Sequence, residues 1–146
     1  MKRQPKVLIL EDELHNHPLF QTAYEEVGFT VKLCQTAEDD FVASVAAFAP
    51  DIIHMDLMIG QPGVEVRRDG FQAIELLKTD ERTKSIPVIV VTNFFQEQKV
   101  RFARALGVKD FINLQGQPIQ SIAARFKTYL DAPKRYQPSH PFFREE

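Results

Sequence analysis

The chain has 146 residues, which fits one domain, and its 44% hydrophobic and 26% charged residues are typical of a soluble globular protein. No apolar run approaches the ~20 residues of a membrane-spanning helix, and the run after the basic start is too short for a signal peptide, so we expect no membrane role. The net charge of −2 gives no global indication of direct nucleic-acid binding.

A cytoplasmic location is expected because the chain has one cysteine, Cys34, which excludes an internal disulfide and fits a reducing compartment. Cys34 lies in an apolar run, where core packing is the favoured interpretation. Charge is unevenly distributed, since residues 1–95 carry 15 acidic and 9 basic side chains whereas residues 96–146 carry 5 and 9. The basic C-terminal third is typical of a solvated face and also fits an acidic partner.

Apolar runs and helical periodicities alternate along the chain. Strands are predicted at residues 6–10, 30–34, 51–55, 86–91 and 109–112. Helices are predicted at residues 18–27, 37–48, 71–78, 96–106 and 118–130, with Thr36 capping the second. The alternation predicts an α/β fold, a doubly wound five-stranded parallel sheet with helices on both faces and the polar fifth strand at an edge.

One domain is expected over residues 5–130, with no internal repeat and no second domain after it. Residues 131–146 contain three prolines and lack periodicity, so this C-terminal tail is expected to be mobile or to lie over the surface. Within the tail, Phe142 and Phe143 can be interpreted as docking on the domain, as docking on a second subunit, or as part of a disordered end.

Three predicted strands end in polar side chains suited to a site. Glu11 and Asp12 follow the first strand, Asp56 the third and Thr92 the fourth. The carboxyl ends of parallel strands meet at one edge of a sheet, where ligands bind. Alone, Asp56 is equally compatible with capping a loop or helix. Three converging carboxylates repel unless a cation lies among them, and their hard oxygens suit Mg²⁺. With a hydroxyl nearby, such an aspartate is suited to accept a phosphoryl group.

In these residues the sequence resembles a response-regulator receiver domain of two-component signalling, with a flavodoxin-like fold. The resemblance covers about residues 5–130. Each motif is weak alone, and their order and spacing together are specific. The resembling residues are Glu11-Asp12, Asp56, Asp69-Gly70, Thr92 and the segment Gly107-Val108-Lys109-Asp110-Phe111.

The resemblance implies a single-domain response regulator rather than an enzyme. Asp56 would be the phosphoacceptor for a histidine kinase or phosphotransfer protein. Mg²⁺ would be held by Glu11, Asp12, Asp56 and the main-chain carbonyl of Met58. Thr92 and Phe111 would be the switch residues.

Output by protein–protein contact is also implied, on the face formed by the fourth helix, the fifth strand and the last helix. Here that face carries Lys99, Arg101, Arg104 and Lys109. A downstream protein target and a homodimer are the partners to be considered.

The chain departs from the family at the lysine-proline pair that usually ends the fifth strand. Counted from Phe111 without a gap, the lysine position is Leu114, and an alternative register places Gln117-Pro118 there. Neither register supplies a lysine. The loop after Asp56 is also longer than usual, and it contains Arg67 and Arg68. One hypothesis is that an arginine from this loop replaces the missing cation, and the alternative is that both are solvated.

Three histidines have alternative interpretations. His54 precedes Asp56 by two positions and is interpreted as a core histidine rather than a pH sensor. His15 and His17 follow the acidic pair and are interpreted as surface residues at a helix start rather than metal ligands.

Two other classes of function compete with a phosphorylatable receiver. A pseudo-receiver, a phosphorylation-independent interaction or dimerisation module, is favoured by Leu114 and the altered loop. A small hydrolase or nucleotide-binding enzyme is disfavoured, because the sequence has no glycine-rich phosphate-binding motif and no cysteine or serine placed as an obvious nucleophile.

Overall fold

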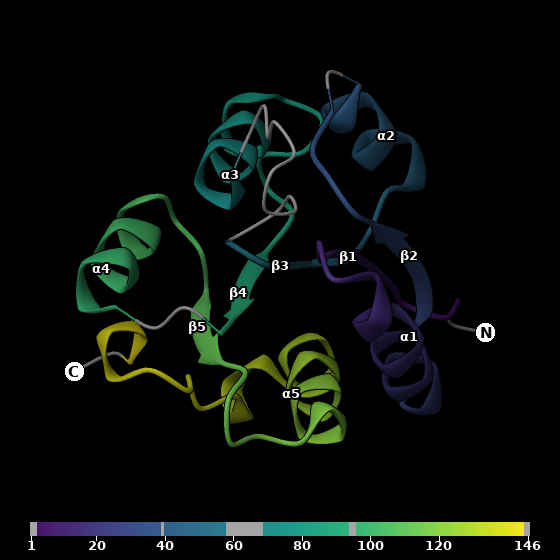
Figure 1. Ribbon diagram of the computed structural model, residues 1–146, viewed down its shortest axis with the longest axis vertical. Coiled ribbons are helices and arrows are strands. Elements are labelled where there is room, and N and C mark those ends of the chain that lie inside the picture. The colour runs from purple at the N-terminus through teal and green to yellow at the C-terminus, as the bar shows by residue number, and fades with distance from the viewer. Residues whose placement is uncertain (1–2, 39, 58–68, 94–95, 145–146) are drawn as a thin grey trace.

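The computed structural model describes residues 3–38, 40–57, 69–93 and 96–144 (Figure 1). The strands are β1 (Lys6–Leu10), β2 (Thr30–Cys34), β3 (Ile52–Met55), β4 (Val88–Thr92) and β5 (Asp110–Asn113). The α-helices are α1 (His17–Glu26), α2 (Phe41–Phe48), α3 (Gly70–Thr79), α4 (Glu97–Ala105) and α5 (Ile119–Asp131). Three short 3-10 helices are η1 (Leu14–Asn16), η2 (Pro133–Arg135) and η3 (Pro141–Phe143).

The five strands form one parallel sheet in the order β2-β1-β3-β4-β5. This confirms the predicted α/β fold and the edge position of the fifth strand. The central strands β1, β3 and β4 are almost continuously buried, as expected for parallel strands covered on both faces.

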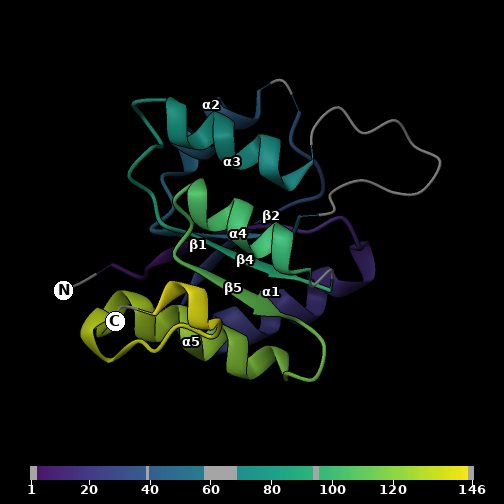
Figure 2. The same ribbon diagram turned by 90° about the vertical axis from the view of Figure 1, so that its left-hand side faces the viewer.

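Helices cover the two faces of the sheet in separate groups, as Figure 2 shows. Helices α2, α3 and α4 pack on one face around a core that includes Leu10, Met55 and Val90. Helices α1 and α5 pack on the other face around Ile9, Ile52 and Val91. Neighbouring strand residues therefore point to opposite cores, and this alternation fixes which face each site residue approaches.

The second helix begins later than predicted. It starts at Phe41 rather than residue 37, and Thr36 is not its cap, so that part of the prediction is wrong. The Thr36 hydroxyl instead donates to the Glu38 carboxylate, 2.7 Å away. Short polar side chains often form such local bonds in place of a helix cap. The helix ends at Ala49, which has a left-handed backbone with φ of 54°.

Helix α5 ends at Asp131, one residue past the predicted domain boundary. The described part of the tail continues through η2 and η3 along β5 to α4 (Figures 1 and 2). Phe142 and Phe143 pack against the core of the α2–α3–α4 face. Among the described residues, none of the helices is both long and apolar enough to cross a membrane.

Candidate functional site

Backbone hydrogen bonds hold the strand ends in register at the carboxyl edge of the sheet. The N–H of Glu11 donates to the carbonyl of Cys34, and the N–H of Asp56 donates to that of Leu10, both at 2.9 Å. These bonds continue the parallel ladders of β1–β2 and β1–β3 by one residue. The acidic residues that follow β1 and β3 are thus placed by the sheet itself.

Three carboxylates meet at this edge. One oxygen each from Glu11, Asp12 and Asp56 lies within 4.8 Å of the others, and the residues are only 3%, 8% and 8% exposed. Burial, followed by the adjacent Glu11 carboxylate, raises the pKa of Asp12. Two charges 4.8 Å apart repel by about 3 kcal/mol at an effective dielectric constant of about 20, so ionising all three is costly without a cation. A buried cluster of hard oxygen donors fits a divalent cation such as Mg²⁺.

Glu11 is held in place by the start of the next segment. Its carboxylate accepts bonds from the Glu13 N–H and the Asn16 amide, both at 3.3 Å. A ring nitrogen of His17 bonds the Glu11 carbonyl at 2.7 Å, and exposed His15 pairs with Glu13 at 3.3 Å. Neither histidine belongs to the carboxylate cluster, which is consistent with surface roles at the helix start.

The two predicted switch residues are both buried. Thr92 is the last residue of β4 and is 1% exposed. Because Met55 pairs with Val90, β4 reaches Thr92 at the same edge as Asp56. Phe111 on β5 is 1% exposed and points into the core of the α2–α3–α4 face.

At the lysine position predicted by the ungapped register, the structure has a half-buried leucine. Leu114 directly follows β5, its N–H donates to the Thr92 carbonyl at 2.9 Å, and its side chain packs with the α1–α5 core. Met58, Arg67 and Arg68 lie outside the described residues, so the predicted carbonyl ligand and the substitute cation stay predictions.

His54 is a core histidine. It is fully buried, its Nδ1 shares a 2.8 Å hydrogen bond with the Tyr24 hydroxyl, and the rings of Phe20 and Phe126 contact its ring. Burial lowers the pKa of His54 to about 3. The imidazole is therefore neutral at physiological pH, and a pH-sensing role there is not supported.

Gly70 lets helix α3 begin against the backbone of the candidate phosphoacceptor. Its N–H donates to the Leu57 carbonyl at 2.9 Å. A Cβ at this position would lie 2.6 Å from Leu57 Cα and would also collide with the Asp56 carbonyl. The helix start is fixed by a capping box, in which Asp69 accepts from the Gln72 N–H and the Gln72 side chain accepts from the Asp69 N–H, both at 2.9 Å.

We expect Gly70→Ala to move the Asp56–Leu57 backbone, because the added methyl group meets main chain rather than a flexible side chain. The free energy of unfolding should fall by about 1–3 kcal/mol in urea titrations. Gln72→Ala is the control, because it breaks the capping box without crowding Asp56. If the Gly70→Ala protein were as stable as wild type, the close approach of position 70 to the Asp56–Leu57 backbone would be contradicted.

Comparison with known proteins gives the family. The family model described as "response regulator receiver domain" matches residues 7–123. The chain belongs to the response regulator receiver family. The match includes Glu11, Asp12, Asp56, Thr92 and Phe111.

Curated relatives of this receiver include regulators with further sequence of their own. The DNA-binding dual master transcriptional regulator RpaA of Synechocystis sp. is 30% identical over 128 residues, covering 86% of this chain and 49% of RpaA. Protein PilH of Pseudomonas aeruginosa is 30% identical over 107 residues, covering 73% of this chain and 83% of PilH. The receiver thus spans about half the length of RpaA and most of PilH.

Solved structures give the same fold at lower identity. The BeF3-activated receiver domain of Klebsiella pneumoniae RstA superposes with a TM-score of 0.73 at 18% identity, covering 86% of this receiver and 98% of that chain. The phosphorylated cyanobacterial phytochrome response regulator RcpA gives a TM-score of 0.72 at 19% identity. The superposition covers 90% of this receiver and 96% of that chain.

Sequence reasoning missed two contributions to the receiver. The capping box at α3 has a local signal, an aspartate followed three residues later by glutamine. The buried carboxylate of Asp110 contacts the C-terminal tail, and no local pattern indicated that Tyr136, 26 positions away, would be its partner.

Proposed function

We propose that this receiver accepts a phosphoryl group on Asp56 from a histidine kinase or phosphotransfer protein and signals by protein–protein contact in the cytoplasm. The observation that carries the proposal is the buried cluster of Glu11, Asp12 and Asp56, with oxygens within 4.8 Å of one another. A structural role alone would not require three like charges in one partly desolvated place.

In the proposed reaction, an Asp56 carboxylate oxygen attacks the phosphorus of a phosphohistidine. The new O–P bond forms as the P–N bond breaks, and the leaving nitrogen keeps the electron pair and takes up a proton. The product is an acyl phosphate on Asp56. Glu11 and Asp12 would hold Mg²⁺ with Asp56, and bound Mg²⁺ would offset the charge on the transferring group. The Thr92 hydroxyl would donate to a phosphoryl oxygen.

Phosphoryl uptake tests this function. The protein is incubated with Mg²⁺ and acetyl phosphate, and its intact mass is measured beside Asp56→Ala. The proposal expects one added phosphoryl mass on wild type and none on Asp56→Ala. No uptake by folded wild-type protein would instead favour the pseudo-receiver.

The second candidate is that pseudo-receiver, an interaction module without phosphate chemistry. The observation in its favour is Leu114, a half-buried apolar side chain where the family usually has the lysine that pairs with the phosphoryl group.

We expect Leu114→Lys to increase the rate of phosphoryl uptake by about tenfold or more, because a cation at this position would stabilise the transferring charge. Intact-mass time courses with acetyl phosphate would measure the change. Leu114→Gln is the control, because it adds polarity without charge. Equal rates for all three proteins would show that the missing lysine does not limit phosphorylation.

A further inference from the structure

The C-terminal tail is anchored on one buried carboxylate. Asp110, at the start of β5, is fully buried and accepts hydrogen bonds from the Tyr136 hydroxyl, the Ser139 N–H (2.7 Å) and the His140 N–H (3.1 Å). It also accepts the Phe111 N–H at 2.8 Å. Burial, followed by Asp110, raises the pKa of Tyr136, so its hydroxyl remains a donor. These bonds fix the path of the tail past β5.

Past this anchor, the tail places two aromatic rings against α4. Phe142 and Phe143 in η3 are half-buried on the core of the α2–α3–α4 face. The Arg101 guanidinium lies 5.0 Å from the centre of the Phe142 ring, a cation–π contact. The Arg144 Nε donates to the Pro138 carbonyl at 3.1 Å and closes the turn. The rings therefore form a fixed part of the surface.

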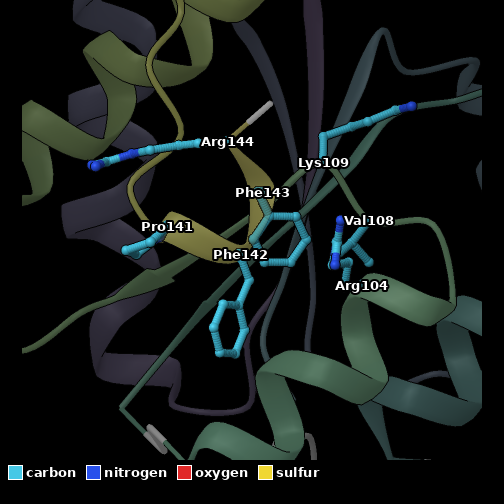
Figure 3. A pocket seen from close by; sticks show the side chains of 7 residues that line it. All are labelled: Arg104, Val108, Lys109, Pro141, Phe142, Phe143 and Arg144. Atoms are coloured by element: carbon cyan, nitrogen blue, oxygen red, sulfur yellow. The ribbon is translucent and has the colours of Figure 1, made fainter. Parts of the chain in front are cut away.

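The tail, α4 and the segment that follows α4 line an open pocket of about 720 Å³. Figure 3 shows the Phe143 ring at its centre, facing Arg104 and Val108, with Lys109 and Arg144 extending outward on opposite sides. A neighbouring cavity of about 510 Å³ shares Arg104 and adds Arg101. The surface thus combines an aromatic wall with a cationic rim.

The charge of this surface is not neutralised by the described part of the chain. No carboxylate is among the described lining residues of either cavity, and neither Arg104 nor Lys109 forms an ion pair with another described residue. Arg101 does pair with Glu97, at 3.3 Å. Burial, followed by the charge of Lys109, lowers the pKa of nearby Lys78. An incoming anionic group would relieve this crowding of positive charge.

We propose that the pocket binds an acidic peptide segment of a partner protein, with an apolar side chain of that segment against Phe142 and Phe143. The proposal deepens, and rests on, the protein–protein output proposed above. Charge complementarity favours carboxylates at the rim, and the aromatic wall gives an anchor for one apolar side chain. A cavity of about 720 Å³ holds a few side chains, which suits a short segment better than the broad face of a second copy. The net charge of −2 disfavours nucleic acid.

The test is selection from a random-peptide phage library on the unphosphorylated full chain, with the same selection on Asp56→Ala. We expect acidic peptides with a leucine or aromatic residue to be enriched on both proteins. Selection of neutral or basic peptides, or no enrichment, would overturn the proposal. If peptides bind both proteins but phosphoryl uptake fails, only the phosphorylation part of the proposed function fails.

Affinities of the enriched peptides, by fluorescence anisotropy, then locate the site. We expect Arg104→Gln with Lys109→Gln to raise the Kd about tenfold or more and to flatten its salt dependence. Arg82→Gln with Lys84→Gln removes two exposed positive charges elsewhere and should leave the Kd unchanged.

Two further measurements separate the pocket from other surfaces. Phe143→Ser should also raise the Kd, since it removes the wall without changing the charge. The assignment of the peptide site to this pocket would be overturned if the Arg82/Lys84 control lost as much peptide affinity as the pocket variants. It would also be overturned if neither pocket variant lost affinity. Sedimentation equilibrium provides the last check, because self-association that Arg104→Gln with Lys109→Gln abolishes would assign the pocket to a second copy and overturn an acidic partner.

Discussion

Asp12→Asn is expected to abolish stabilisation by Mg²⁺ and to lower the rate of phosphoryl uptake by about a hundredfold or more. The reason is that Asp12 lies within 4.8 Å of both Glu11 and Asp56 and would supply one of the three carboxylates to the cation. In urea titrations, wild type should gain about 2.7 kcal/mol when Mg²⁺ is present at about a hundred times its Kd, and Asp12→Asn should gain none.

Without Mg²⁺, Asp12→Asn should not lower the free energy of unfolding. The pKa of Asp12 is raised in the folded protein, by burial and then by Glu11, so its contribution to stability is present at low pH and is lost as pH rises through the folded pKa. At neutral pH Asp12→Asn should therefore be at least as stable as wild type. Glu25→Gln, on the exposed face of α1, is the charge-matched control. Equal Mg²⁺ stabilisation of all three proteins would contradict the cation site.

Acid is expected to destabilise this protein in part by protonating His54. Its folded pKa is about 3, against an ordinary value of 6.5, because the imidazole is fully buried beside Tyr24 and two phenylalanines. Because the folded pKa is lowered, the contribution of His54 to the free energy of unfolding is fully present above pH 6.5. This contribution is lost as pH falls toward 3. The contribution of His54 to the free energy of unfolding should fall by about 1.4 kcal/mol per pH unit across that window.

Urea titrations across this pH range would measure the slope. His54→Gln keeps a side chain that can hydrogen-bond the Tyr24 hydroxyl but cannot be protonated, so its slope should be shallower than that of wild type. His15→Gln is the control, because it removes an exposed histidine outside the core. Other carboxylates, such as Asp51 beside Arg3, contribute in all three proteins, so only the difference reports on His54. Identical slopes for wild type and His54→Gln would contradict the assignment.

The centre of the sheet was predictable because the strands β1, β3 and β4 are buried on both faces. Runs such as Val7–Leu10 and Val88–Val91 have no polar face, and the predicted positions of Asp56 and Thr92 followed from the ends of those runs. Parallel topology then brings the acidic residues together without further information. That is why Glu11, Asp12 and Asp56 could be predicted to lie together from their places at the ends of two predicted strands.

Features that depend on distant or crowded contacts were less predictable. Thr36 has the residue type of a helix cap, but a local bond to Glu38 and the later start of α2 override that preference. The requirement for glycine at position 70 depends on a backbone collision that only the folded chain defines. The anchoring of the tail depends on Asp110 meeting Tyr136, a long-range pair with no periodic signal.

Phosphorylation of Asp56 is tested most directly by chemical trapping of its acyl phosphate. The protein is treated with Mg²⁺ and acetyl phosphate, reduced with borohydride and digested, and its peptides are sequenced by mass spectrometry. Reduction of an aspartyl phosphate gives homoserine, so we expect homoserine at position 56 and at no other aspartate. An unmodified Asp56, or homoserine at Asp12 in its place, would contradict this expectation.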